Sequence, residues 1–318
     1  MPTSLISAVV VDQARPERLF IQQVPLAPPR PGEVTVNVTA FSLNRGETKR
    51  ALTVTPTGVR PGWDLAGTVE STNGVRGAPP EGTRIVGTVP LGSWAERVHV
   101  ALTSLAVLPD DVSDAQAATL PVAGLIALHG LRRGGLILGR KVLIDGASGG
   151  VGQMAIQLAA AAGAKVFAHI RNEDQRVLVE TYATGAVAVG PSLEAARPLG
   201  PFDLIVESIG GSALSAAMTM LRKNGTCVTL GRSEGETVQF SLAGMYDARN
   251  TSLQSLILAD DLAATEPAGN GLAILVDLVA RGVLVPTIGV EAPWTEIAAI
   301  ARRLIDRELT RKAVLHVG

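Results

Sequence analysis

Six residues between an apolar run and an alanine-rich stretch have the spacing of a phosphate-binding turn. They read Ala-Ser-Gly-Gly-Val-Gly over residues 147–152, after the apolar run 141–145 and before a helical pattern. Glycines in such a turn let the backbone approach a pyrophosphate and let the helix pack close to the strand, and the N–H groups at the helix start attract phosphate. The sequence therefore predicts a dinucleotide-binding turn, although Ala147 stands at the first glycine position. A tight strand-to-helix turn without a ligand is the alternative. The residues expected to contact the ligand belong to the turn itself: Ser148, Gly149, Gly150 and Val151.

A positively charged side chain follows the next expected strand. A fold that binds NAD usually has Asp or Glu about 20 residues after the glycines, where it binds the ribose 2′-hydroxyl. This chain has Ile170 and Arg171 at that place, followed by Asn172. A guanidinium forms charge-assisted hydrogen bonds with a 2′-phosphate, each worth about 1.5–3 kcal/mol. The sequence predicts NADPH as the cofactor, bound by Arg171 and Asn172. A solvated loop position for Arg171 is the alternative, and Arg176 is a second candidate.

Short β-branched runs alternate with helical patterns from Lys141 onwards. One of the expected helices covers residues 173–183. This rhythm is typical of βαβ units that form a parallel sheet, with a sixth strand at 252–258. Ligands of such sheets bind at the carboxyl ends of the strands. We therefore expect Gly231 and Ser233, which follow the fifth strand, to contact the cofactor.

The sequence pattern before residue 119 is different: short expected strands are separated by glycine and proline turns. That pattern predicts an all-β domain. The segment 115–133 is expected to be a buried helix broken at Pro121. After the sixth strand, helices alternate with strands at 284–289 and 312–317, and this tail is expected to return to the first domain. The predicted domains are residues 1–120 with 259–318, and residues 121–258.

Composition excludes several classes of function. The 318 residues carry a formal net charge of −1 and show no basic stripe, which argues against nucleic acid and anionic membranes as partners. No secretory or membrane-spanning pattern is evident, so a cytoplasmic protein is expected. The single Cys227 cannot form an internal disulfide, and the four histidines have no metal-ligand spacing, so no metal site is predicted.

Four further segments, in this order before the glycine turn, carry a family resemblance: FSLNRGE at 41–47, RPGWDLAGTVE at 60–70, GSWAERVHV at 92–100 and LPVAGLIALHGL at 120–131. Together with the glycine turn they resemble the medium-chain dehydrogenase/reductase superfamily, and within it the zinc-free quinone oxidoreductase branch, which includes the enoyl reductases of polyketide assembly. The resemblance implies an α/β chain with a β-rich, GroES-like catalytic domain and a six-stranded, doubly wound Rossmann domain.

The resemblance also implies where the substrate binds. Metal-dependent members have Cys and His where this chain has Asn44 and Trp63. Without zinc, the acceptor of the hydride has to be electron-poor already, such as a quinone or an α,β-unsaturated carbonyl. Asn44 would bind the substrate carbonyl, the nicotinamide ribose or its carboxamide, and Trp63 would form a flat wall over the substrate. A turn-forming Asn44 and an ordinary core Trp63 are the alternatives. The tyrosine that related enoyl reductases offer as proton donor is missing here.

The expected function is therefore zinc-independent, NADPH-dependent hydride transfer to a quinone or an α,β-unsaturated carbonyl. A trans-acting enoyl reductase or tailoring reductase of a biosynthetic, polyketide-like pathway is one alternative, and a catalytically silent cofactor-binding protein is another. Family members often pair the sixth strand across a two-fold axis, so the resemblance also implies a homodimer.

Overall fold

The computed structural model describes residues 4–235 and 237–318. Two compact units divide the chain. The β-rich unit comprises Met1–Leu125 and Thr265–Gly318, and the parallel-sheet unit comprises Ile126–Ala264.

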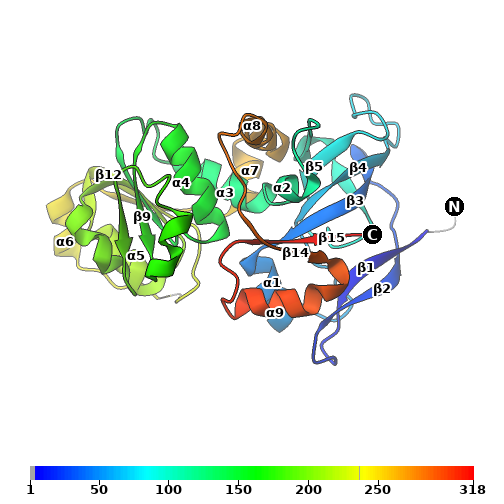
Figure 1. The fold of residues 1–318 in the computed structure, drawn as a ribbon, viewed down its shortest axis with the longest axis horizontal. Helices are drawn as coiled ribbons and strands as arrows, with labels where there is room; N and C mark the ends of the chain where they lie inside the picture. The colour runs from blue at the N-terminus through cyan, green and yellow to red at the C-terminus, as the bar shows by residue number, and fades with distance from the viewer. Residues whose placement is uncertain (1–3, 236) are drawn as a thin grey trace. The chain divides into compact units, whose positions relative to one another are not determined.

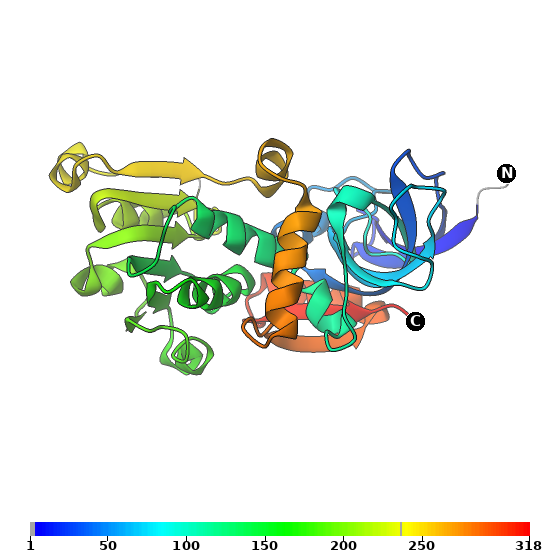
Figure 2. The ribbon, with the colours of Figure 1, turned by 90° about the horizontal axis from the view of Figure 1, so that it is seen from above.

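The parallel-sheet unit is built on six strands in the order β10-β9-β8-β11-β12-β13, and every neighbouring pair is parallel. Numbered along the chain, this is the order 3-2-1-4-5-6 of a doubly wound dinucleotide-binding fold, which confirms the predicted fold class. Figure 2 shows β13, in yellow, along one edge of the sheet. The strands are β8 (Lys141–Asp145), β9 (Lys165–Ile170), β10 (Ala186–Val189), β11 (Phe202–Glu207), β12 (Leu221–Thr229) and β13 (Ser252–Ser255).

Helices connect these strands, and Figure 1 shows α4 and α5 packed beside the sheet. They are α4 (Gly150–Ala161), α5 (Gly211–Met218), α6 (Leu242–Ala248) and α7 (Leu258–Ala264), with 3₁₀ turns η2 (Glu173–Leu178) and η3 (Leu193–Leu199). The α-helix expected over 173–183 was wrong, because only the 3₁₀ turn η2 forms there. The alternating β-branched residues Val177, Val179 and Thr181 disfavour a continued α-helix.

The β-rich unit contains a seven-stranded sheet and a separate hairpin of β1 and β2. The sheet has the order β14-β15-β3-β4-β5-β7, and β6 also pairs with β3. Strand β15 runs antiparallel to β3 and places Ala313 opposite Leu43. The strands are β1 (Leu5–Val11), β2 (Leu19–Pro25), β3 (Glu33–Leu43), β4 (Asp64–Ser71), β5 (Arg84–Thr88), β6 (Arg97–Ala101), β7 (Leu105–Val107), β14 (Ile288–Pro293) and β15 (Lys312–His316).

The predicted break at Pro121 is confirmed, because α2 (Asp114–Ala118) ends before it and α3 (Pro121–Arg132) begins with it. Proline suits the first turn of a helix, where its missing N–H has no intrahelical partner to lose. The other helices and 3₁₀ turns of the β-rich unit are α1 (Arg45–Thr53), η1 (Leu102–Ser104), α8 (Ala268–Ala280), η4 (Trp294–Glu296) and α9 (Ile297–Ile305). The strand expected at 284–289 begins later, at Ile288, because Pro286 cannot donate to a strand ladder.

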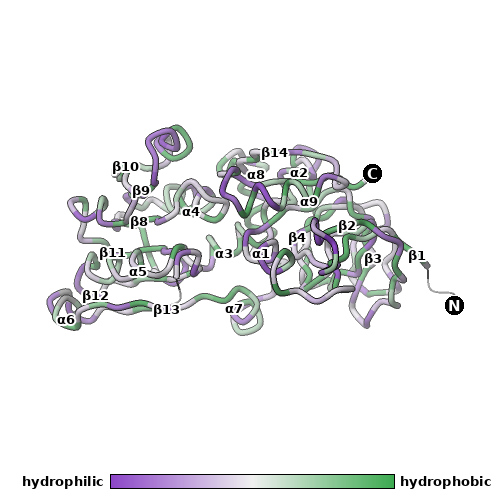
Figure 3. The backbone as a smooth tube through the Cα atoms, turned by 90° about the horizontal axis from the view of Figure 1, so that it is seen from below, coloured by the Kyte–Doolittle hydropathy of each residue, from purple (hydrophilic) through white to green (hydrophobic). Residues whose placement is uncertain are grey.

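Each unit has an aromatic pair in its core. In the β-rich unit Trp94 stacks on Phe41 with ring centroids 5.9 Å apart, and in the parallel-sheet unit Phe167 meets Phe202 edge-on at 5.4 Å. Burying each such side chain contributes roughly 1.5–3 kcal/mol. Figure 3 colours the backbone by hydropathy and shows an apolar stretch between β13 and α7.

Within the described ranges, no single helix is long and apolar enough to cross a membrane. One bent pair, α7 with α8, passes the same test of length and composition when the two are taken together.

Candidate functional site

The glycine turn between β8 and α4 is tightly constrained. A Cβ atom added at Gly152 would lie 2.3 Å from the carbonyl oxygen of Gly146, so the helix packs on the strand only without a side chain there. Gly146 itself has φ +69°, a conformation that favours glycine. Gly149 caps α4, and no side chain of the described residues caps the helix. The N–H groups of the first turn are therefore not used by a side-chain cap, which is the condition for binding a phosphate there.

The loops after β8, β11 and β12 meet at the carboxyl edge of the sheet. Ser208 Oγ donates a hydrogen bond of 3.1 Å to the carbonyl of Asp145, and a Cβ on Gly231 would lie 2.5 Å from the Ser208 carbonyl oxygen. Ser233 Oγ lies 3.4 Å from the carbonyl of Ile209. The predicted residues Gly231 and Ser233 are thus on a loop that packs against the loop following β11.

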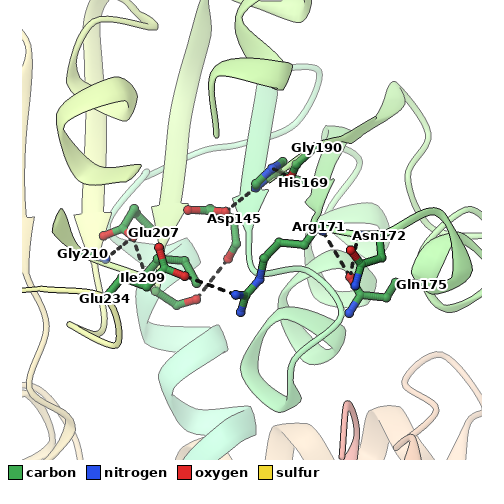
Figure 4. Close-up of polar contacts among 11 residues, drawn as sticks. Asp145, His169, Arg171, Asn172, Gln175, Gly190, Glu207, Ile209, Gly210 and Glu234 are labelled. Carbon is green, nitrogen blue, oxygen red and sulfur yellow. Dashed lines mark hydrogen bonds and ion pairs between the residues drawn. The ribbon is translucent and has the colours of Figure 1, made fainter. Parts of the chain in front are cut away.

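Arg171 leaves the end of β9 and reaches toward the loop after β12 (Figure 4). Its guanidinium lies 3.3 Å from the carboxylate of Glu234, and the two side chains are 41% and 36% exposed. The backbone N–H groups of Arg171 and Asn172 both donate to Gln175 Oε1, at 3.1 and 3.4 Å. The second candidate, Arg176, pairs with Glu173 inside η2.

A buried hydrogen bond between a histidine and an aspartate, which was not predicted, lies beneath the glycine turn. His169 Nδ1 is 2.6 Å from Asp145 Oδ1, and His169 Nε2 is 3.1 Å from the carbonyl oxygen of Gly190. Both ring nitrogens thus have an oxygen partner inside the protein, one from a carboxylate and one from the backbone. The signal for this pair was its position, because both residues lie at or near the ends of adjacent parallel strands, in register.

Glu207, also not predicted, shapes the loop after β11 (Figure 4). Its Oε1 accepts hydrogen bonds from the backbone N–H groups of Ile209 and Gly210, at 2.5 and 2.6 Å, and its Oε2 accepts one from Thr229 Oγ1 at 3.1 Å. Burial raises the pKa of Glu207 to about 6, and the nearby Asp145 adds to this effect, while the hydrogen bonds oppose it. The carboxylate therefore fixes the loop next to the glycine turn.

In the β-rich unit, Asn44 caps α1 and is held by three charged side chains. Its Nδ2 donates to Asp64 Oδ2 at 2.7 Å and to Glu47 Oε1 at 3.0 Å, and its Oδ1 accepts from Lys312 Nζ at 2.6 Å. The ammonium fixes the orientation of the amide, because an N–H cannot point at it. Both amide N–H groups are therefore used inside the protein, and a ligand would meet Asn44 through Oδ1.

The carboxylates around Asn44 are buried together with a single ammonium. Asp64 Oδ2 also accepts from Ser42 Oγ at 2.7 Å and lies 3.4 Å from Lys312 Nζ. Burial raises the pKa of Glu47 well above its usual range, and Asp64 raises it further, while its bonds to Asn44 and the charge of Lys312 oppose this. Burial lowers the pKa of Lys312, against the pull of both carboxylates. Of the two carboxyl groups, Glu47 is the one whose ionisation the surroundings oppose, and it lies beside the ion pair of Asp64 and Lys312.

Trp63 lies next to this cluster. It precedes Asp64, and the edge of its ring lies 3.7 Å from a Cβ atom built on Gly46, in the first turn of α1. The side chain is half-buried. The structure therefore places Asn44 and Trp63, the two predicted catalytic residues, at the same end of one helix.

The side chains at this position do not suit zinc. Zinc sites in proteins use mainly Cys and His ligands, whereas here an asparagine and two carboxylates surround the ammonium of Lys312. Across residues 4–235 and 237–318, no group of three or more His, Cys, Asp or Glu side chains is placed to hold a metal ion.

Known proteins resemble this chain in sequence and in fold. A family model described as zinc-binding dehydrogenase matches residues 150–273. A mycocerosic acid synthase-like polyketide synthase of Mycobacterium tuberculosis is 31% identical over 303 residues, which are 91% of this chain and 14% of that protein. The chain thus spans about one seventh of that relative's length.

Two further comparisons cover smaller enzymes. An acryloyl-coenzyme A reductase of Sulfurisphaera tokodaii is 33% identical over 141 residues, which are 44% of this chain and 42% of that one. The structure of a mycobacterial quinone oxidoreductase superimposes with a TM-score of 0.86 at 22% identity, covering 98% of this chain and 100% of that one, so the two share a fold.

Proposed function

Because this chain belongs to the medium-chain dehydrogenase/reductase superfamily, we propose that it is a zinc-independent oxidoreductase that uses NADPH to reduce a quinone or an α,β-unsaturated carbonyl compound. The observation that carries the proposal is the glycine turn at the switch point of the parallel sheet, with Arg171 instead of a carboxylate at the end of β9.

The turn and the neighbouring loops would hold the cofactor. The N–H groups of Gly150 and Val151, at the start of α4, and Ser148 in the turn before it would bind the pyrophosphate, whereas the N–H of Gly149 already donates to the carbonyl of Gly146 at 3.0 Å. Gly231 and Ser233 would offer backbone and hydroxyl groups on the loop after β12. Arg171 and Asn172, which follow β9, would bind the 2′-phosphate of the adenosine ribose. A reduced nicotinamide, when bound, supplies a hydride.

The acceptor has to take this hydride without help from a Lewis acid, since the donor set around Asn44 does not suit zinc. A quinone or a conjugated carbonyl meets this demand, because it delocalises the negative charge that the hydride brings. Trp63 would present a flat apolar surface to such a molecule. Asn44, whose N–H groups already donate to carboxylates, would contact a ribose hydroxyl or the carboxamide through Oδ1.

Turnover tests the proposal directly. NADPH consumption, followed at the nicotinamide absorbance band, should occur with 9,10-phenanthrenequinone or with a simple enone, and should survive removal of metal ions by a chelator. No consumption with any quinone, enone or enoyl thioester would favour a catalytically silent cofactor-binding protein. Loss of activity on chelation, restored by zinc, would contradict zinc independence.

Cofactor choice is tested at Arg171. The substitution Arg171→Ala should weaken NADPH binding by about 10- to 150-fold, the equivalent of one charge-assisted contact. NADH binding should not weaken, because NADH lacks the phosphate. Equal losses for both cofactors would remove Arg171 from the 2′-phosphate site.

A reductase of enoyl thioesters is the second candidate. The relatives named above favour it, because one is a polyketide synthase and another is a reductase of acryloyl-coenzyme A, an α,β-unsaturated thioester. Activity on crotonyl-coenzyme A with none on quinones would select this candidate.

We also propose a homodimer formed through β13. This strand lies at the edge of the sheet, and Leu253 and the following Ile257 are 42% and 62% exposed. An exposed edge strand needs a partner or a cover. Light scattering should show a dimer that Leu253→Lys converts to a monomer, whereas Ile274→Lys, an equally exposed position on α8, should leave it unchanged. A monomeric wild-type chain would refute the dimer.

A further inference from the structure

The ion pair of Arg171 and Glu234 joins two strands that are not neighbours. Arg171 follows β9 and Glu234 follows β12, and β8 and β11 lie between them in the sheet. Adjacent strands are about 4.8 Å apart, so β9 and β12 are separated by three spacings, or about 14 Å. The two side chains, together with the loop after β12, cover that separation at the carboxyl edge of the sheet.

Glu234 reaches this position because its loop folds back over the loop after β11. Its backbone N–H donates to the carbonyl of Ile209 at 2.9 Å, and Gly235 forms an isolated bridge with Gly210. A Cβ atom on Gly210 would lie 2.9 Å from Arg232 Cα, so the two loops are in close contact. The carboxylate is thus presented by a packed loop (Figure 4).

The two side chains lie at the edge of the sheet where a dinucleotide is expected to bind. In doubly wound sheets the ligand lies at the carboxyl ends of the strands, at the point where the strand order reverses. That point here is between β8 and β11, where the glycine turn begins. A dinucleotide bound at this point would therefore meet the ion pair of Arg171 and Glu234.

We propose that the carboxylate of Glu234 competes with the cofactor for Arg171. Glu234 must release the guanidinium of Arg171 before a nicotinamide dinucleotide can bind. The inference rests on the proposed function, because it takes the glycine turn as a dinucleotide site. Glu234 thereby sets the affinity for cofactor without setting the choice between NADPH and NADH.

The competition should change the affinity for both cofactors without changing the preference for NADPH over NADH. Both cofactors have to break the same ion pair, so both lose the same free energy from it. NADPH then gives Arg171 a new partner in the 2′-phosphate, whereas NADH gives it none. Removing the carboxylate should therefore tighten both cofactors by one common factor and leave their ratio unchanged.

The variant Glu234→Gln tests this by titration with NADPH and with NADH at low ionic strength. A half-exposed pair of this kind supports an increase in affinity of about two- to five-fold. The gain should shrink in 0.5 M NaCl, because salt screens exposed pairs. Glu194→Gln is the matched control, since Glu194 also forms an exposed pair, with Arg197, and its removal changes the net charge equally. That control should leave both affinities unchanged.

The double variant Arg171→Ala/Glu234→Gln completes the test. If the ion pair is the barrier, Glu234→Gln should give no gain for NADH when Arg171 is already absent. A gain of the same size in that background would show that Glu234 merely repels phosphate, and would overturn the inference. So would unchanged or weaker binding of both cofactors to Glu234→Gln.

Failure of the proposed function looks different. If Arg171→Ala weakened NADPH and NADH equally, the assignment of the 2′-phosphate would fail, while the gain from Glu234→Gln would still show the competition. If neither cofactor bound to the wild-type chain or to Glu234→Gln, both proposals would fall together.

Discussion

Two buried charged clusters, one in each unit, solve the problem of burying carboxylates in different ways. In the edge cluster, made of Asp145, His169 and Glu207, each carboxyl group has its own partner: the imidazole of His169 for one and two backbone N–H groups for the other. In the lysine cluster, made of Asn44, Glu47, Asp64 and Lys312, one ammonium lies beside two carboxyl groups, and burial raises the pKa of Glu47 well above its usual range.

The difference lies in how far each cluster depends on one residue. Backbone N–H groups cannot be lost by mutation, so Glu207 keeps two of its donors whatever happens to side chains nearby. Asp64 has one backbone donor, the N–H of Val122 at 3.0 Å from its Oδ1, and its charge is balanced by the single Lys312. We therefore expect the lysine cluster to be the more fragile of the two.

The largest expected effect is that of Lys312→Met. Removing one partner of a buried ion pair typically costs about 3–5 kcal/mol, because the other charge stays buried and uncompensated. The free energy of unfolding, measured with urea, should fall by this amount. Lys49→Met, an exposed position on α1, should change it by less than about 0.5 kcal/mol. Equal losses for the two variants would show that Lys312 does not hold this cluster together.

More of the edge cluster than of the lysine cluster could be predicted from the sequence. The alternation of strands and helices and the glycine turn are local patterns, and they led to the parallel sheet and to residues 148–151. Asp145, His169 and Glu207 stand at or near the ends of predicted strands, in the same local pattern. They were overlooked because a polar residue at a strand end reads equally well as a loop residue.

The lysine cluster lay beyond such reasoning. Lys312 meets Asp64 across 248 positions of sequence, and it does so because β15 pairs with β3 at the end of the chain. No local period encodes that pairing. The resemblance to known enzymes pointed to Asn44 and Trp63 but said nothing of the ammonium beside them, so the use of both Asn44 N–H groups emerged only from the structure.

The second expected effect concerns pH and belongs to the edge cluster. Glu207 has a pKa of about 6 in the folded chain, against an ordinary value of 4.5. A carboxyl whose pKa is raised by folding contributes stability that is fully present below about pH 4.5 and is lost as the pH rises through about 6. The loss amounts to about 2 kcal/mol.

Glu207→Gln should remove this loss, because the amide stays neutral and its oxygen still accepts from the backbone of Ile209 and Gly210. The difference in unfolding free energy between variant and wild type should therefore shift in favour of the variant by about 2 kcal/mol between pH 4.5 and pH 7. The exposed Glu81→Gln should show no such shift. A constant difference across this range would mean that folding does not raise the pKa of Glu207.

The smallest expected effect compares one hydroxyl from each cluster. Ser42 donates to Asp64 at 2.7 Å, and Thr229 donates to Glu207 at 3.1 Å. A hydrogen bond to a buried charge is worth about 1.5–3 kcal/mol, but Glu207 keeps two backbone donors when Thr229 is lost, so Thr229→Val should cost only about 0.5–1.5 kcal/mol. Ser42→Ala should cost more, when both are measured by urea unfolding at pH 8.

The same pair of variants also separates the clusters by pH. The bond from Thr229 lowers the pKa of Glu207, so Thr229→Val should raise that pKa and move the pH-dependent loss of stability above about pH 6, whereas Ser42→Ala should leave it in place. Equal costs and an unmoved pH dependence would contradict the difference in fragility. They would mean that the two backbone donors of Glu207 protect it no better than one backbone donor and one ammonium protect Asp64.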